Sequence, residues 1–264
     1  MSTGINLLSG GSGRTYRDPE ISPEGPNSAA PLSDEDRARN EELVERYAGD
    51  LYHADAATIL EWTAQHVDGP AVITMSMENT VLAELAKDHL PGTDLLFLDT
   101  EYHFEETIAV ADAVEKRYPE SRLIRTHALL SRAEQDSVYG KDLYRRNPTA
   151  CCRMRKVEPL QRHLSPYVAM IDGLRRDDGP TRAEAPALSL NKTGRLKISP
   201  IITWSLEETE DFIRERDLIV HPLTYQGYPS IGCATCTMPV AEGEDPRAGR
   251  WAGSAKTECG LHTD

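Results

Sequence analysis

The chain has 264 residues, a mass of 29.3 kDa and a formal net charge of −14 at pH 7. This acidic balance argues against a general nucleic-acid binder, because lysine and arginine supply most of the affinity for phosphate backbones. No apolar run approaches the roughly 18 residues that span a bilayer, and the polar start lacks the charged-then-apolar order of a signal peptide. We therefore expect a cytoplasmic protein with neither a nucleic-acid nor a membrane partner.

The first elements are an arm and two helices. Residues 1–31 are rich in Gly, Ser and Pro with little hydrophobic periodicity, which predicts a flexible arm without chemistry of its own. A helix is expected after Ser33, an N-cap candidate followed by three acidic residues that suit the positive end of a helix. Residues 56–67 predict a second helix.

Short apolar runs then alternate with helical segments. Strands are predicted at 71–75, 94–98, 122–126 and 167–172, and helices at 80–89, 105–118 and through the basic stretch 141–162. This alternation predicts an α/β fold, a parallel twisted sheet with helices on both faces. Ligands of such sheets bind beyond the carboxyl ends of the strands, at the topological switch point. Polar residues stand at three of these ends, at 76–80, 99–100 and 172–176.

The pattern changes after residue 177. Residues 188–199 predict a hairpin, and Ser205 with Glu208 forms a capping box that opens a helix to about residue 217. From residue 221 onward the chain is rich in Gly and Pro and is predicted to be loop-like. A long loop-rich segment in a compact protein is usually functional or disordered, and the residues embedded here favour function.

Five cysteines give the clearest chemical signal: Cys151-Cys152, Cys233-x-x-Cys236 and a lone Cys259. Cytoplasmic thiols are kept reduced, so ligands or reactive groups are expected, with a vicinal disulfide as the alternative. A Cys-x-x-Cys pair serves zinc or iron equally well, whereas adjacent cysteines are uncommon in structural zinc sites. The first four cysteines are therefore predicted to hold a metal centre, with an iron–sulfur cluster favoured over zinc.

The lone cysteine stands apart on a Gly-rich tail. Lys256 and His262 flank Cys259 and would favour its thiolate, the form that acts as a nucleophile. The alternative is a tail cysteine without a role. A cysteine on a tail can close over a bound substrate and then swing out to a protein reductant, which favours the nucleophile.

Basic residues indicate a small anionic ligand. Residues 141–162 carry seven basic and two acidic side chains, a local charge of +5 that encloses the cysteine pair. Arg175, Arg247 and Arg250 are candidates for forked contacts to phosphate or sulfate oxygens, although lone arginines are usually surface charge. The segment 76–80 places a helix N-terminus where a phosphate could bind, but it contains no glycine, and an ordinary capped helix start is the alternative.

Several motifs in order resemble the assimilatory adenylyl-sulfate (APS) reductases of the phosphoadenylyl-sulfate (PAPS) reductase superfamily. They are Cys-Cys-x-x-Arg-Lys at 151–156, Gly-Leu-Arg-Arg at 173–176, Tyr-Pro-Ser-Ile-Gly-Cys-x-x-Cys at 228–236, Gly-Arg-Trp at 249–251 and Glu-Cys-Gly-Leu-His at 258–262. The resemblance runs from about residue 71 to the C-terminus. It implies an adenine nucleotide alpha-hydrolase-like fold.

The resemblance also implies site residues. A [4Fe-4S] cluster would be held by Cys151, Cys152, Cys233 and Cys236, and Cys259 would be the nucleophile. The substrate-binding residues would be Ser76, Thr100, Lys156, Arg175, Arg247, Arg250 and His262. The chain departs from the family in two places: Glu101 stands where the family has the glycine of Leu-Asp-Thr-Gly, and 76–80 lacks the glycine of a modified phosphate loop.

The activity implied is reduction of adenosine 5'-phosphosulfate to sulfite and AMP, with thioredoxin as the partner and an S-sulfocysteine at Cys259. Three alternatives stay open: a cluster-containing PAPS reductase, a transfer-RNA-thiolating enzyme of the same fold, and a non-enzymatic zinc-binding module. The expected organisation is an arm at 1–31, a nucleotide-binding α/β domain at 32–220 and a cluster-binding, catalytic tail at 221–264. The sequence leaves open whether the chain forms a homo-oligomer.

Overall fold

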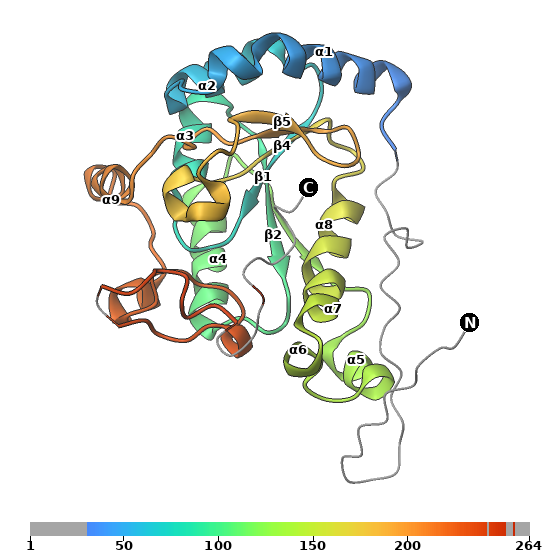
Figure 1. Cartoon of the computed structure of the whole chain (residues 1–264), viewed down its shortest axis with the longest axis vertical. Helices are drawn as coiled ribbons and strands as arrows, with labels where there is room; N and C mark the ends of the chain where they lie inside the picture. Colours follow the sequence, from blue (N-terminus) through green and yellow to red (C-terminus); the bar gives the residue numbers. More distant parts are fainter. Residues whose placement is uncertain (1–30, 242, 252–255, 257–264) are drawn as a thin grey trace.

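The computed structural model describes residues 31–241, 243–251 and 256 (Figure 1). The predicted N-terminal arm, apart from residue 31, lies outside these residues, and so do Cys259 and His262. The helices are α1 (Asp34–Leu51), α2 (Ala56–His66), α3 (Val81–His89), α4 (Glu105–Arg117), α5 (Arg132–Tyr139), α6 (Leu143–Arg146), α7 (Pro148–Cys152), α8 (Glu158–His163) and α9 (Leu206–Glu215). The strands are β1 (Ala71–Met75), β2 (Asp94–Asp99), β3 (Leu123–His127), β4 (Ala169–Ile171), β5 (Leu188–Leu190) and β6 (Leu196–Ile198).

The strands form one sheet in the order β3-β2-β1-β4-β6-β5. All neighbours are parallel except β5, which pairs antiparallel with β6 in the hairpin that the sequence predicts. The chain builds outward from β1 through β2 to β3 and then returns to place β4 on the other side of β1. The switch point therefore lies between β1 and β4, where the segments 76–80 and 172–176 leave the sheet.

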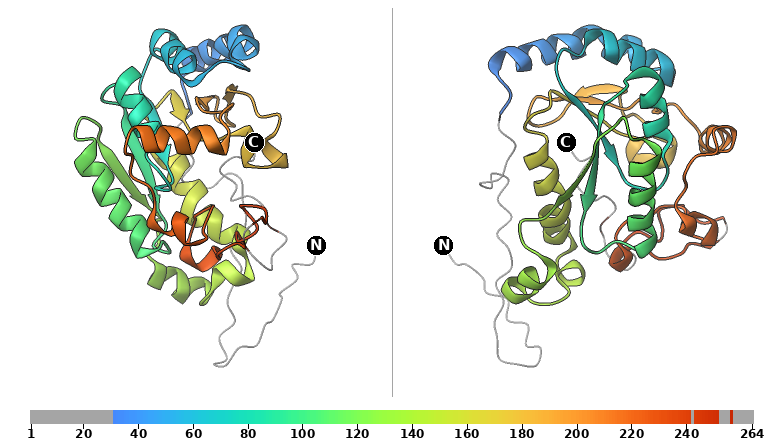
Figure 2. Two further views of the ribbon diagram at one scale, coloured as in Figure 1. Left: turned by 90° about the vertical axis from the view of Figure 1, so that its left-hand side faces the viewer. Right: turned by 180° about the vertical axis from the view of Figure 1, so that it is seen from behind.

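Helices cover both faces of the sheet, as predicted: α3 and α4 lie on one side and α7 and α8 on the other (Figures 1 and 2). Neighbouring residues of one strand supply the two cores, because successive strand side chains point to opposite faces. Ile73 belongs to the larger core with α2, α3 and α4, whereas Val72 packs with Leu160 and Leu164 on the side of α8. Together these contacts confirm the predicted fold class.

Local signals account for the helix starts. Ser33 accepts a hydrogen bond from the backbone of Asp36, and Ser205 and Glu208 form the predicted capping box. A further capping box, Ser131 with Glu134, opens α5, a helix that the sequence analysis did not predict. The basic stretch is helical but interrupted.

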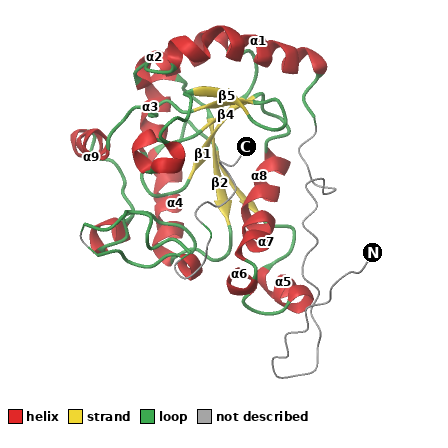
Figure 3. Ribbon diagram, in the orientation of Figure 1, coloured by secondary structure: helices red, strands yellow, loops and turns green. Residues whose placement is uncertain are grey.

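The segment after α9 is mostly loop and short 3₁₀ turns, as expected (Figure 3). It lies at the same end of the molecule as α5, α6 and α7, the end toward which β2 runs (Figure 1). Among the described residues, no helix is long and apolar enough to cross a membrane.

Candidate functional site

Four cysteines from two distant segments line one small cavity. Cys151 and Cys152 end α7, and Cys233 and Cys236 flank a 3₁₀ turn in the C-terminal segment. All four are free thiols, and only Cys236 is more than marginally exposed. The cavity is completed by Tyr102, Tyr144, Pro148, Arg155, Lys156, Thr235, Arg250 and Trp251. The structure thus brings the predicted ligand set together, and the vicinal disulfide is not formed.

The Cys-x-x-Cys turn is closed by its own backbone and by a threonine. The amide of Cys236 donates to the carbonyl of Cys233 at 2.9 Å, and the Thr237 hydroxyl donates to the same carbonyl at 2.9 Å. The Thr237 hydroxyl also accepts from the amide of Gly232 at 3.1 Å. A Cβ at residue 232 would overlap the guanidinium of Arg250, so a larger residue at this position would displace that side chain.

The turn is anchored to the end of β2. The amide of Ala234 donates to the carbonyl of Tyr102 at 2.7 Å, and the Thr100 hydroxyl lies 3.3 Å from the Cys233 sulfur. Thr100 is fully buried, so the hydroxyl of this predicted substrate-binding residue lies against a cysteine sulfur.

The donor chemistry of the cavity fits a soft, positively charged group. Burial, and then the neighbouring Cys152, Cys233 and Cys236, raise the pKa of Cys151 to about 12. Burial also raises the pKa of Cys236. Crowded thiols of this kind become thiolates only when a metal compensates their charge.

A single ion fits the spacing less well. Within the described residues, no three His, Cys, Asp or Glu side chains are arranged to hold one metal ion. Zinc–sulfur bonds of about 2.3 Å would require the four sulfurs to converge on one point. A four-iron cluster gives each cysteine its own iron and so accepts sulfurs that are farther apart.

A π-helical turn carries two cations into this cavity. Residues Arg153–Val157 form a π-helix between α7 and α8, within the helical region that was predicted through the basic stretch. Pro159 has no amide hydrogen to donate to the carbonyl of Arg155 four residues earlier, which favours a wider turn there. Arg155 and Lys156, the basic pair of the Cys-Cys-x-x-Arg-Lys motif, are both buried and both line the cavity.

The segment after β1 is tied to the C-terminal segment. Ser76 is exposed at the end of β1, and Met77 adopts a left-handed conformation with φ 64°. The backbone carbonyl of Glu78 accepts from the amide of His221 at 2.9 Å, and its carboxylate accepts from the amide of Ile231 at 3.1 Å. Burial raises the pKa of Glu78, opposed by this amide and by the charge of Arg250.

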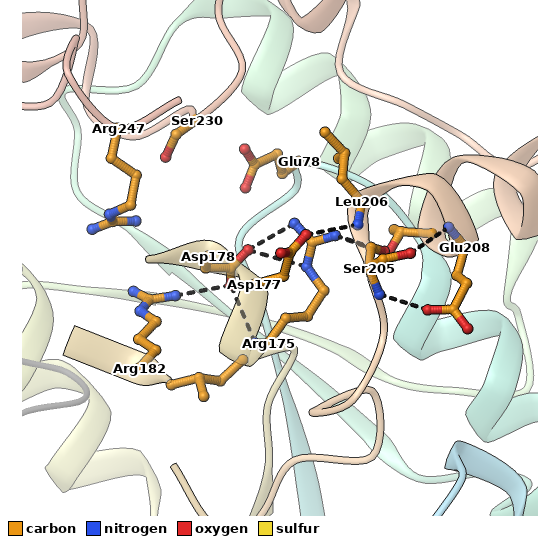
Figure 4. A network of polar contacts seen from close by, with 12 residues as sticks. Glu78, Arg175, Asp177, Asp178, Arg182, Ser205, Leu206, Glu208, Ser230 and Arg247 are labelled. Atoms are coloured by element: carbon orange, nitrogen blue, oxygen red, sulfur yellow. Dashed lines mark hydrogen bonds and ion pairs between the residues drawn. The ribbon is translucent and has the colours of Figure 1, made fainter. Parts of the chain in front are cut away.

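Arg175 is engaged within the protein (Figure 4). Its Nε and Nη2 donate to Asp178 at 3.1 and 2.7 Å, and its Nη1 donates to the Thr209 hydroxyl at 2.9 Å and to the carbonyl of Ser205 at 3.3 Å. Arg182 also pairs with Asp178, at 3.1 Å. Most of the donors of the predicted anion clamp are thus used to fix the segment after β4 against α9.

Arg250 connects the two parts of the site. Its guanidinium donates to the Ser230 hydroxyl at 3.2 Å and lies 4.6 Å from the ring centre of Trp251, while its buried Nε has no partner among the described residues. Its charge acts both on Cys236 in the cavity and on Glu78 beside β1. Arg247 is half-buried one turn earlier (Figure 4). Lys156, Arg250 and the four cysteines are therefore the predicted site residues that one cavity unites.

Three residues of this site were missed as functional candidates: Arg155, Tyr102 and Glu78. A signal existed for Arg155, because it follows Cys151 by four residues and Cys152 by three, the spacing that places helical side chains on one face. No spacing in the sequence connects Glu78 with Ile231 or with Arg250.

The fold and the site define an α/β protein with a thiol-lined cavity and clustered cations at the carboxyl edge of its sheet. The sequence profile of the phosphoadenosine phosphosulfate reductase domain matches residues 70–239, and the chain belongs to this family.

Its relatives include proteins named adenosine 5'-phosphosulfate reductase. That of Mycolicibacterium smegmatis is 48% identical over 84% of this chain and 94% of its own. That of Rhodococcus erythropolis is 48% identical over 83% of this chain and 93% of its own. The crystal structure of phosphoadenylyl-sulfate (PAPS) reductase from Candida auris shares the fold, with a TM-score of 0.63 and 23% identity over 80% of this chain and 100% of that chain. These matches confirm the family that the sequence motifs resemble.

Proposed function

We propose that this protein reduces adenosine 5'-phosphosulfate to sulfite and AMP, with thioredoxin as the electron donor. The observation that carries the proposal is the convergence of the four motif cysteines on one cavity with Lys156 and Arg250. The names of relatives at 48% identity support the choice of substrate.

In the proposed reaction, the Cys259 thiolate attacks the sulfur of the sulfate group. The bond between that sulfur and the bridging phosphate oxygen breaks, so AMP leaves and an S-sulfocysteine forms. A thioredoxin thiolate then attacks the Cys259 sulfur, which releases sulfite, and the second thioredoxin thiol resolves the mixed disulfide. The two electrons gained by the substrate sulfur come from the thioredoxin dithiol.

The cations of the site stabilise the charge that develops on the leaving phosphate. Arg250 and Lys156, which line the cavity, are proposed for this role, together with Arg247, three residues before Arg250. Fixed charges of this kind often supply the largest part of the rate acceleration. His262, and the exposed Ser76 at the end of β1, are proposed to bind the phosphosulfate and the nucleotide.

The four cysteines are proposed to hold a [4Fe-4S] cluster, which supplies charge and local structure and carries no electrons in this reaction. The residues fit the group: four buried or half-buried sulfurs surround one cavity, and three cations, Arg155, Lys156 and Arg250, line it. The chain's own contribution is to fix Arg155 and Lys156 through the turn that the cluster cysteines begin.

The proposal is tested by anaerobic purification and a sulfite assay. The protein should contain about four iron and four sulfide per chain and release sulfite from adenosine 5'-phosphosulfate only with reduced thioredoxin. Cys259→Ser should retain the iron and lose the activity. Zinc in place of iron, or a preference for phosphoadenylyl sulfate, would contradict the cofactor or the substrate respectively.

A further inference from the structure

His221 is a fully buried titratable side chain that the proposed reaction does not use. Its exposed fraction is 0%, and it stands where the chain leaves α9 and enters the C-terminal segment. An isolated bridge between Asn79 and Val220 precedes it, and the segment that it opens carries Cys233 and Cys236. A buried imidazole at such a junction is expected to satisfy both ring nitrogens.

The hydrogen bonds of the ring fix its tautomer. The backbone amide of Leu223 can only donate, and it lies 3.3 Å from Nδ1, so Nδ1 is the acceptor. The hydrogen of the neutral ring is therefore on Nε2, which donates to the Thr107 hydroxyl at 2.9 Å. A protonated ring carries a hydrogen on both nitrogens and loses the bond to Leu223.

These bonds join three separate parts of the molecule. Thr107 lies on α4, and Leu223 lies in a short 3₁₀ turn of the C-terminal segment, Pro222–Gln226. The amide of His221 itself donates to the carbonyl of Glu78, in the loop after β1, at 2.9 Å. His221 therefore attaches the start of the C-terminal segment to α4 and to the loop after β1.

An aromatic contact extends this attachment toward the cysteines. The ring of Phe104, the N-cap residue of α4, lies 6.4 Å from the ring of His221 and 5.6 Å from the ring of Tyr228, centre to centre and edge-on. Tyr228 begins the motif that ends in the Cys-x-x-Cys pair. A displacement of His221 would therefore reach the segment that holds the cysteine turn.

Burial favours the neutral form of the ring. It lowers the pKa of His221, opposed by the carboxylate of Glu106 on α4. His103, in the loop before α4, is electrostatically coupled to His221, and burial lowers its pKa as well. Burial raises the pKa of Glu78 on the facing loop. The uncharged form of all three groups, His221, His103 and Glu78, is thus favoured where the segment is attached.

We infer that neutral His221 is a positioning residue for the proposed reaction: through Thr107 and Leu223 it holds the C-terminal segment on α4. The inference rests on the proposed function, because this segment carries the cysteine turn and Arg250. When the ring is protonated, the bond to Leu223 is lost and a buried charge appears, so the attachment weakens.

The direction of the pH dependence follows from the lowered pKa. The contribution of the ring is fully present above about pH 6.5, the unfolded value. It is lost as the pH falls through the lower folded value, because the unfolded chain then binds a proton that the folded chain does not.

The test uses the cluster-loaded full chain with His221→Gln, Thr107→Val and Thr107→Ser. Glutamine can place its amide nitrogen near the position of Nε2 but does not accept from the Leu223 amide, whereas valine removes the acceptor of Nε2 and serine keeps it. Two quantities are measured: hydrogen–deuterium exchange of peptides from residues 222–236, and the rate of the SO₃ mass gain with adenosine 5'-phosphosulfate in the absence of thioredoxin.

His221→Gln and Thr107→Val should exchange about three- to tenfold faster in this segment, the effect of losing one hydrogen bond. Both should also gain mass more slowly, and Thr107→Ser should behave as the wild type. Peptides from α3 in the same sample are the internal reference. Between about pH 7.5 and 5.5, the wild type should lose protection at residues 222–236 relative to α3, and His221→Gln should not.

His53→Gln is the matched control, since it removes an exposed histidine and should behave as the wild type. If His221→Gln does not fold, Thr107→Val compared with Thr107→Ser carries the test. The inference would be overturned by unchanged exchange, by equal acceleration in α3, or by faster exchange with an unchanged rate of mass gain. A wild type without mass gain would instead overturn the proposed function, while its exchange at residues 222–236 would still test the contact.

Discussion

Glu78 is one of the residues that join the switch-point loop to the C-terminal segment. Its carboxylate accepts from the amide of Ile231, two residues before Cys233, and is within the electrostatic reach of Arg250. Burial raises the pKa of this carboxyl, so at a pH between the unfolded and the folded pKa the folded state holds a proton that the unfolded chain has lost. A proton bound only in the folded state makes stability depend on pH.

The Glu78→Gln variant should remove this dependence. In the wild type, the contribution is fully present below about pH 4.3, the unfolded value, and is lost as the pH rises through the raised folded value. The free energy of unfolding, measured with urea between pH 4 and 8, should therefore fall less with rising pH in the variant. The exposed Glu41→Gln serves as the control. Equal pH slopes in Glu78→Gln and the wild type would contradict the assignment.

At the residue scale, the members of the short motifs lie together, and their chemical roles stay predictions. The four cysteines, Lys156 and Arg250 share one cavity, as their motifs suggested. Prediction from residue type was less informative for arginine, because a guanidinium at a strand end can bond to other protein groups instead of to a ligand. Asp178 lies three residues after Arg175 and engages it, and only the backbone turn between them reveals this pairing.

At the scale of elements, the site depends on how the Cys-x-x-Cys turn packs on residues 249–251, which follow it in the chain. The amide of Met238 donates to the carbonyl of Gly249, and the amide of Trp251 donates to the carbonyl of Cys236. These bonds bring the Gly-Arg-Trp motif against the cysteine turn. Both motif glycines are at close approaches: residue 232 faces the Arg250 guanidinium, and residue 249 faces a backbone carbonyl of Met238.

The two glycines should respond differently to alanine. At residue 249 the added methyl meets rigid backbone, so Gly249→Ala should destabilise the protein by about 1–3 kcal/mol, the usual cost of overpacking. At residue 232 it meets the end of a flexible side chain, so Gly232→Ala should stay folded but displace Arg250 and lower the rate of sulfite release. Urea unfolding and the sulfite assay measure the two effects. A Gly249→Ala protein as stable as the wild type would show that this packing is wrong.

The interrupted helix shows what periodicity cannot predict. A single helical region was expected through the basic stretch, but the chain forms α6, α7, a π-helical turn and α8. Pro159 was visible in the sequence, yet a proline predicts a break or kink and not its register. The wider turn is what allows Arg155 and Lys156 to be buried in succession beside the cysteines.

For the whole molecule, alternation of strands and helices was sufficient to predict the α/β class. The predicted strands 71–75 and 94–98 match β1 and β2 within one residue, because their short apolar runs strongly favour buried strands. The position of the hairpin beside β4 could not be predicted, because its short strands carry no signal for their neighbour. The contact between residue 78 and residue 231 likewise depends on the completed chain.

Binding of the product should stabilise the whole fold. AMP at 100 times its Kd should add about 2.7 kcal/mol to the free energy of unfolding, which corresponds to a rise in Tm of roughly 5–10 °C for a chain of this size. Thermal unfolding with AMP or adenosine 3',5'-bisphosphate compares the two nucleotide types. AMP should stabilise more at equal concentration. A larger shift with the bisphosphate would favour phosphoadenylyl sulfate as the substrate.

The central claim is that Cys259 forms a covalent intermediate beside a cluster that transfers no electrons. The most direct measurement is the intact mass of the cluster-loaded protein after incubation with adenosine 5'-phosphosulfate in the absence of thioredoxin. The mass should increase by one SO₃ group, reduced thioredoxin should remove it, and Cys259→Ser should show no increase. A gain that persists in Cys259→Ser, or an active wild type that shows no gain, would contradict this account.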